Sequence, residues 1–276
     1  MSQTSSAKLA VLGTGKLGEA VLDGVLAAGL MRADDVIATA AHAERLDALG
    51  ALAARAGLRT TLDNRAAASE ARTVLIAVKP NAVADVLADI GPAITPEHVV
   101  ICAAASVPTA FVEARLPAGA AVVRAMPNTP SRIRAGMTAL APGSHATPEH
   151  VAAARAIFDA VGRTLVVDER HMDAITGLSA SGPAFLYIAL EALAEGGVKV
   201  GLPRDVATEL AAQTMLGAGA MVLQTGEHPA RLKDAVTTPA GCTIDGILEL
   251  EEGGLRVTLI KAVVQAARRA SELLER

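Results

Sequence analysis

The chain has 276 residues, which is enough for one large domain or two ordinary domains with a substantial core. A formal net charge of −4, no tryptophan and a single tyrosine argue against a nucleic-acid binder, because such proteins normally present a basic face and aromatic side chains that stack on bases. The two cysteines, Cys102 and Cys242, lie far apart and form neither a disulfide framework nor a zinc-binding spacing, so we expect no metal site.

The start of the chain has no cationic segment, and its first apolar run has the length of a strand, so we expect no signal peptide. We also expect no membrane span, since no segment offers the ~20 clean apolar residues that crossing a bilayer requires. These features favour a cytoplasmic protein.

Residues 1–167 alternate short β-branched runs with helical patterns, which is typical of βαβ units and a parallel sheet. Helices are expected after the first strand to about residue 28, over residues 43–57 and from residue 148. The expected strands are residues 8–12, 36–39, 73–78, 99–103, 122–124, 138–140 and 164–167. We therefore predict an α/β domain over residues 1–167.

The strand signal stops after residue 168, and an all-α domain is expected over residues 168–276. Its predicted helices cover residues 171–195, 203–225, 228–236, 243–252 and 255–275. The segment "AAQTMLGAGAMVLQTG", which includes most of the helix over 203–225, is apolar nearly all round, and a helix of this kind needs to be buried on every side. It is either shared with another subunit or central within its own domain.

The first strand runs directly into Gly13-Thr14-Gly15-Lys16-Leu17-Gly18, a G-x-G-x-x-G pattern at the start of a helix. Gly13 permits a tight turn, Gly15 lets a pyrophosphate approach the backbone, and Gly18 lets the helix lie close to the sheet. The helix N-terminus adds free N–H groups for phosphate. The context of strand, turn and helix predicts a dinucleotide site.

The end of the second strand indicates which dinucleotide is bound. An acidic residue there would hold the ribose of NAD, but the sequence has Thr39, followed by two alanines and His42. The missing carboxylate favours NADP, with NAD also possible, and Thr39, His42 and Arg45 could donate hydrogen bonds. Alternatively, His42 and Arg45 are only solvated residues at the start of a helix.

Two more turns follow expected strands, on the edge where ligands of parallel sheets bind. Val78-Lys79-Pro80 follows the third strand, and Asn128 lies in the "MPNTP" turn. The ammonium of Lys79 and the amide of Asn128 could reach a ribose or the nicotinamide.

The helical half contains a second candidate site. Ser181 stands before Gly182-Pro183 as an expected N-cap. Farther on, Pro239 and Gly241 interrupt the chain between Thr238 and Thr243, and a helix follows. The N–H groups of Gly241, Cys242 and Thr243 would be free at this helix start, which predicts an anion site of carboxylate size.

These motifs together resemble one family over essentially the whole chain. "HPARLKDAVTTPAGCTIDGILELE", with "GLSASGPAF", "GGVKVGLPR", "MPNTP" and "GTGKLG", is similar to pyrroline-5-carboxylate reductase. The resemblance implies reduction of L-1-pyrroline-5-carboxylate to L-proline, the last step of proline biosynthesis, with hydride from NADPH or NADH. It also implies a Rossmann-type N-terminal domain and a helical C-terminal domain that forms homodimers, often assembled into decamers.

The resemblance also implies site residues. The substrate carboxylate falls on Thr238, Gly241, Cys242 and Thr243, and Thr243 is the position proposed to interact with the ring nitrogen. Cys102, Ala103 and Ala104 join the cofactor set.

The chain departs from the family pattern at three places. Ala240 replaces a glycine, Ser106 replaces another, and residues 39–41 replace a trio such as Ser-Asn-Arg.

Two alternatives compete with the reductase. A β-hydroxyacid dehydrogenase would need a lysine on the first long helix of the second domain, but no lysine lies between Lys79 and Lys199. A non-catalytic NADP-binding sensor would have no use for a carboxylate site. Imine reduction needs no covalent intermediate, so we expect the Cys242 side chain to pack as a small apolar group while its N–H serves the substrate.

Overall fold

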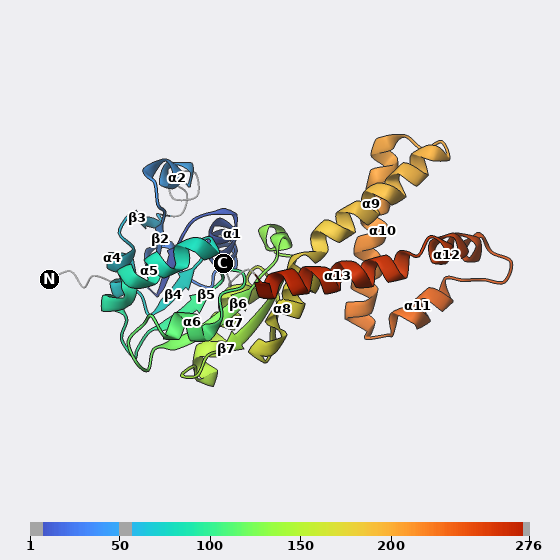
Figure 1. Ribbon diagram of the computed structural model, residues 1–276. Helices are drawn as coiled ribbons and strands as arrows, with labels where there is room; N and C mark the ends of the chain where they lie inside the picture. Colours follow the sequence, from blue (N-terminus) through green and yellow to red (C-terminus); the bar gives the residue numbers. More distant parts are fainter. Residues whose placement is uncertain (1–7, 50–56, 273–276) are drawn as a thin grey trace. The chain divides into compact units, whose positions relative to one another are not determined.

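The computed structural model describes residues 8–49 and 57–272, and within them the first half of the chain forms one eight-stranded sheet (Figure 1). The strand order is β3-β2-β1-β4-β5-β6-β7-β8. The strands are β1 Leu9–Leu12, β2 Val36–Thr39, β3 Arg59–Thr61, β4 Thr73–Ile76, β5 Val99–Cys102, β6 Ala121–Met126, β7 Gly136–Pro142 and β8 Gly162–Val166.

The six strands from β3 to β6 pair in parallel, whereas β7 runs antiparallel to β6 and β8 runs parallel to β7. The chain moves outward from β1 to β2 and β3, and then crosses to β4 on the other side of β1. This order is the Rossmann order, and it places the switch point between β1 and β4, where ligands of such sheets bind. The predicted Rossmann-type, mostly parallel domain is confirmed.

Helices cover both faces of the sheet because each strand alternates its side chains between two apolar layers. In β1, Ala10 and Leu12 face one layer, and Leu9 and Val11 face the other. The first layer packs against α4 Asn64–Glu70, α5 Val83–Ile90 and α6 Thr109–Glu113. The second packs against α1 Lys16–Ala27, α2 Ala43–Ala48 and α7 Pro148–Asp159.

The chain divides into two compact units, and the second unit, Ser181–Gln265, is entirely helical outside its turns. The first unit holds the sheet, the residues up to Ala180 and those from Ala266 onward. The later helices are α9 Gly182–Lys199, α10 Arg204–Thr225, α11 Pro229–Ala235, α12 Cys242–Glu252 and α13 Leu255–Glu272.

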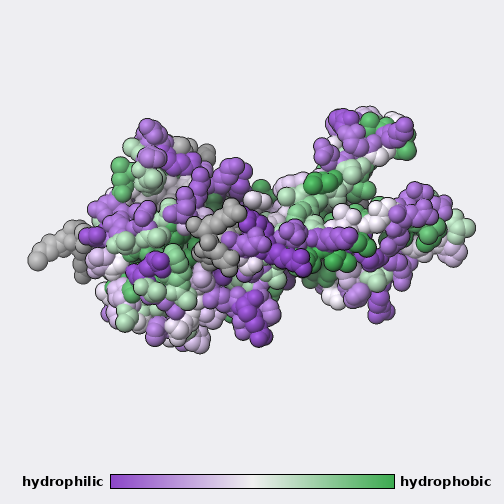
Figure 2. Space-filling model, in the orientation of Figure 1, coloured by the Kyte–Doolittle hydropathy of each residue, from purple (hydrophilic) through white to green (hydrophobic). Residues whose placement is uncertain are grey.

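The helices of the second unit expose many large apolar side chains, visible as green surface over this unit in Figure 2. On α9 and α10 these side chains are Leu186, Tyr187, Ile188, Leu193, Val206, Leu210, Leu216, Met221 and Leu223. Along α10 the buried residues are Ala207 and Ala211. The alternative of α10 as a central helix of its own domain is therefore wrong for this single chain.

Two helical stretches, Glu169–Lys199 and Arg204–Thr225, are long and apolar enough to cross a membrane by length and composition alone. The expectation that no segment reaches this threshold is wrong on that measure. The same composition also suits helices that are covered by another protein chain.

The predicted helix over residues 171–195 is interrupted. Short α8 (Met172–Ile175) continues into a π-helical turn, Thr176–Ala180, before α9 begins. Pro183 explains the break, because proline has no N–H to donate to the carbonyl of Ser179 four residues earlier. The sequence reading also missed β3, α4, α5 and α6. The expected helix over 43–57 forms α2, while residues 50–56, the first seven residues and the last four lie outside the described residues.

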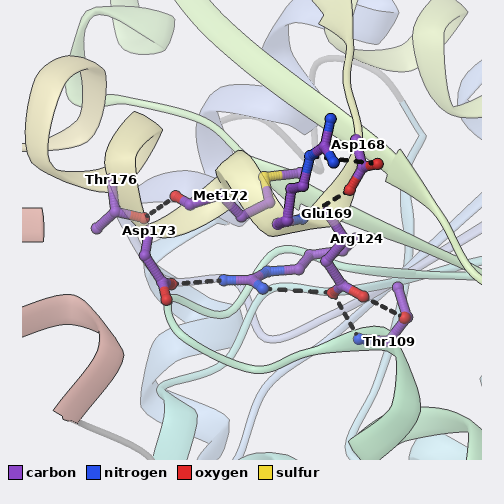
Figure 3. Close-up of polar contacts among 8 residues, drawn as sticks. Thr109, Arg124, Asp168, Glu169, Met172, Asp173 and Thr176 are labelled. Atoms are coloured by element: carbon purple, nitrogen blue, oxygen red, sulfur yellow. Dashed lines mark hydrogen bonds and ion pairs between the residues drawn. The ribbon is translucent and has the colours of Figure 1, made fainter.

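A buried arginine joins the sheet to the segment that follows β8 (Figure 3). Arg124, on β6, has a side chain only 5% exposed and forms ion pairs with Glu169 at 3.3 Å and Asp173 at 3.6 Å. Glu169 also accepts hydrogen bonds from the N–H and hydroxyl of Thr109, at 2.7 and 2.5 Å, at the start of α6. One carboxylate thus connects β6, α6 and the segment before α8.

We expect Glu169→Ala to lower the free energy of unfolding of the sheet unit by about 3 kcal/mol, because it leaves a buried guanidinium without its main partner. Asp173→Ala should cost about 1 kcal/mol, since Asp173 is 42% exposed and lies farther from the arginine. Urea unfolding followed by circular dichroism measures both values. Equal losses for the two variants would contradict this assignment.

Candidate functional site

The glycine turn after β1 has room for a ligand at one position and none at the other two. Gly13 has φ +93°, and a Cβ on it would lie 2.6 Å from Cγ1 of Val78. A Cβ on Gly18 would lie 2.2 Å from the carbonyl oxygen of Gly13. A Cβ on Gly15 would meet nothing within 4 Å. Gly13 and Gly18 therefore allow close packing, and Gly15 leaves open space above the turn.

The start of α1 fits the phosphates of a dinucleotide. Gly15 is the N-cap residue and provides no side-chain hydrogen bond, so the first N–H groups of this 12-residue helix are not capped by it. Beside it, the hydroxyl of Thr14 is buried and has no hydrogen-bond partner among the described residues. A buried polar group without a partner is costly unless a ligand or water satisfies it. Both observations favour a bound anion here.

The two neighbouring strands bring further predicted residues to the same edge. The N–H of Ala77 donates to Leu12 at 2.8 Å, and that of Ala103 donates to Ile76 at 2.9 Å, so the turns after β1, β4 and β5 lie side by side. Exposed Lys79 and Pro80 follow β4 on this edge, after half-buried Val78.

Three residues at the end of β5 are buried: Cys102, Ala103 and Ala104. Only a small part of their surface is therefore accessible to a ligand. Burial raises the pKa of the Cys102 thiol to about 11. Its thiol is therefore protonated and shielded.

The end of β2 differs from the expectation. The side chain of Thr39 is buried, and its hydroxyl donates to Oδ1 of Asn64 at 2.6 Å, so it is already engaged. His42 is exposed just before α2. Arg45, on α2, reaches back to the glycine turn and donates from Nε to the carbonyl of Thr14 at 2.5 Å.

A pocket of about 280 Å³ lies beside the start of α1, within the sheet unit. Its walls include Lys16, Leu17, Ala103, Asn128, Ser131 and Ala180. Four of these residues, Lys16, Leu17, Ala103 and Asn128, belong to the predicted cofactor set. The volume is close to the lower end of small-molecule sites.

Asn128 organises one wall of this pocket with both ends of its amide. Its Oδ1 accepts from the N–H of Met137 at 2.9 Å, and its Nδ2 donates to the carbonyl of Ser179 at 3.2 Å. That carbonyl is the one left without a helical donor by Pro183. Asn128, which we predicted to contact the cofactor, thus also holds the π-helical turn in place.

The Thr238–Thr243 stretch lies in the helical unit and forms a tight turn before α12. The N–H of Gly241 donates to the carbonyl of Thr238 at 3.0 Å, which closes the turn. Pro239 and then Ala240, with φ +60°, occupy its central positions, as in a type II turn. A Cβ on Gly241 would lie 2.5 Å from the hydroxyl oxygen of Thr238.

This geometry changes which amides are available for an anion. The N–H of Gly241 is used within the turn, so the expectation of three free amides is wrong for this residue. Cys242 and Thr243 are the first two residues of α12, and their N–H groups have no helical partner. The Cys242 side chain is exposed, contrary to the expected packing, and Thr243 is half-buried. Ser181 precedes α9 with helical dihedrals and makes no capping hydrogen bond.

The sequence reading missed several residues of this region. Ser131 lines the pocket with a buried hydroxyl that has no partner among the described residues, and it lies three residues beyond Asn128 in the same turn. Asn64 was missed because neither β3 nor α4, which begins at Asn64, was predicted. Among the described residues, no group of three His, Cys, Asp or Glu side chains could hold a metal ion.

Family comparisons match two parts of the chain. Residues 169–273 match the family described as pyrroline-5-carboxylate reductase dimerisation, and residues 8–106 match that described as NADP oxidoreductase, coenzyme F420-dependent.

Full-length relatives are similar throughout. A pyrroline-5-carboxylate reductase from Methanosarcina acetivorans is 43% identical over 96% of this chain and 97% of its own. The solved reductase from Coxiella burnetii is 35% identical with a TM-score of 0.90, covering 97% of this chain and 98% of its own. The Plasmodium falciparum pyrroline carboxylate reductase, solved with NADP bound, is 25% identical with a TM-score of 0.85, covering 97% of this chain and 98% of its own.

We expect Ala240→Gly to stabilise the helical unit by about 1 kcal/mol, because a non-glycine residue is strained at φ +60°. Gly226→Ala is the matched control: Gly226 has φ +69° and open space around it, so this change should destabilise by a similar amount through the backbone alone. Thermal unfolding of the two variants measures both. Shifts of the same sign would contradict the left-handed conformation at Ala240.

We expect an aromatic disulfide reagent at pH 8 to label one thiol per native chain, that of Cys242, because Cys102 is buried and its pKa is raised. Labelling should disappear in Cys242→Ala, and two thiols should react after denaturation. Rapid labelling of native Cys242→Ala would show that Cys102 is accessible.

Proposed function

The chain belongs to the pyrroline-5-carboxylate reductase family, and we propose from this membership that it reduces the C=N bond of L-1-pyrroline-5-carboxylate to L-proline, the last step of proline biosynthesis. The observation that carries this function is the identity of about 40% with named reductases over nearly the whole chain. The enzyme is an NAD(P)H-dependent oxidoreductase.

The residues at the carboxyl edge of the sheet suit the cofactor of such an enzyme. Gly15 gives a pyrophosphate access to the backbone, and the first turn of α1 offers it N–H groups. The pocket lined by Lys16, Ala103 and Asn128 would take the nicotinamide end. When bound, NADPH or NADH supplies the hydride.

We propose the Thr238–Thr243 turn as the site of the substrate carboxylate. The N–H groups of Cys242 and Thr243 point along the start of α12, where the helix dipole favours an anion. The hydroxyls of Thr238 and Thr243, with Ser181 as a further contact, would complete the binding of the ring. The backbone shape of Gly241, which a Cβ would disturb, keeps Thr238 close.

A protonated imine is already an electrophile, so the protein contributes mainly by positioning the substrate. Thr243 is our candidate for the interaction with the ring nitrogen and for proton donation. A β-hydroxyacid dehydrogenase would need a lysine on the first long helix of the second domain, and this chain has none there. A non-catalytic sensor would not need an anion site at α12.

We also propose that residues 1–167 serve the cofactor, and residues 168–276 serve the substrate and oligomer assembly. Residues 169–273 match a dimerisation family, and α9 and α10 expose their apolar side chains. A second copy of this chain is a better cover for them than a lipid bilayer. A homodimer, with assembly into a decamer, and a cytoplasmic location are part of the proposal.

The direct test follows NADPH and NADH oxidation with pyrroline-5-carboxylate, or the reverse reaction with proline at high pH. Turnover with either cofactor is expected, and the ratio of the two rates gives the cofactor preference. No turnover with either would overturn the proposed function.

We expect Thr243→Ala to lower kcat at saturating substrate at least tenfold, as is usual when a proton-transfer group is lost. Cys242→Ala is the matched control and should keep most activity, because it preserves the backbone N–H. Unchanged turnover of Thr243→Ala would remove this threonine from proton transfer. Near-complete loss in Cys242→Ala would give the thiol a direct role.

A further inference from the structure

Arg45 connects the two structural elements that flank the adenosine side of the cofactor site. It lies on α2, just beyond the end of β2, and its Nε donates to the carbonyl of Thr14 in the glycine turn at 2.5 Å. Its Nη2 donates to the carboxylate of Glu19, on α1, also at 2.5 Å. In a Rossmann domain, the adenosine ribose binds between the first glycine turn and the end of the second strand. The guanidinium is therefore fixed beside that ribose position.

The other groups at the end of β2 cannot supply the same chemistry. The hydroxyl of Thr39 is buried and bonded to Asn64, and residues 40 and 41 are alanines. His42 is exposed, and its imidazole makes no hydrogen bond with another described residue. Asn64 can offer its amide, which is uncharged. Arg45 is thus the permanent positive charge among these groups.

The geometry of Arg45 leaves donors for a ligand. A guanidinium has five N–H groups, and the two bonds to Thr14 and Glu19 use one on Nε and one on Nη2. The rest make no bond with any other part of the chain that the structure describes. The side chain is 36% exposed, so these donors are accessible from solvent. A planar fork with free N–H groups is well suited to a phosphate.

We propose that Arg45 binds the 2′-phosphate of NADPH and so sets the preference for NADPH over NADH. This inference rests on the proposed function, because it concerns the cofactor of the same site. The position differs from residues 39–41, where the family pattern has a polar and basic trio, so in this chain the charge comes from the following helix. Glu19 holds the orientation of the guanidinium and balances part of its charge.

Arg45→Ala tests the proposal by isothermal titration with NADP⁺ and NAD⁺, alongside kinetics with NADPH and NADH. The loss of a charge-assisted hydrogen bond to phosphate should weaken NADP⁺ binding about tenfold, and NAD⁺ binding should change less than twofold. The KM for NADPH should rise in parallel, while kcat stays close to that of the wild type.

Arg72→Ala is the matched control, because Arg72 is an exposed arginine that precedes β4 at the opposite edge of the sheet and lies 3.7 Å from Glu97. It should leave the binding of both dinucleotides unchanged. Arg45→Lys keeps the charge and loses the fork, so an intermediate loss of NADP⁺ affinity is expected. If Arg45→Ala does not fold, Arg45→Lys decides the question.

An equal loss of NADP⁺ and NAD⁺ affinity in both Arg45 variants, or no loss in either, would overturn this role of Arg45. Wild-type protein that binds neither dinucleotide would instead overturn the proposed function. The two failures are therefore distinguishable in one set of titrations.

Discussion

The close approach of α1 to the end of β1 is the constraint on which the rest of the sheet unit depends. A Cβ on Gly18 would lie 2.2 Å from the carbonyl oxygen of Gly13, so α1 can occupy its place only because residue 18 has no side chain. That place directs the N–H groups of α1 along the carboxyl edge of the sheet. It also brings Glu19 and the carbonyl of Thr14 within reach of Arg45. The packing of α1 and the proposed binding of the cofactor thus have the same cause.

The two units differ in how much of their apolar surface they bury within a single chain. The sheet unit buries two continuous apolar layers, and the ion pairs of Arg124 fasten the segment that follows it. The helical unit buries few residues and exposes many large apolar side chains on α9 and α10. Since apolar burial provides most of the free energy of folding, the helical unit needs a further surface to cover it. Its match to a family described by dimerisation supports the proposal that a second copy provides that cover.

The sequence predicted those features that depend on local pattern. The bounds of β2 and the G-x-G-x-x-G turn follow from β-branched runs and glycine spacing, and the structure agrees. Features that depend on distant partners were missed or misjudged. The bond of Thr39 to Asn64 joins residues 25 apart, and the Asn128–Ser179 bond joins residues 51 apart. The structure also explains why the family pattern has glycine at two places where this chain departs from it. Ser106 and Ala240 both have positive φ, a conformation that favours glycine.

The most direct test of this account is the effect of Gly15→Ala on the binding of NADP⁺. Gly15 has a φ of −66°, and a Cβ there meets nothing within 4 Å, so the variant should fold with unchanged stability. The added methyl group would occupy the space that a pyrophosphate needs, so titration calorimetry should show at least a tenfold loss of affinity. A variant that folds normally and binds NADP⁺ as tightly as the wild type would contradict the placement of the cofactor at this turn.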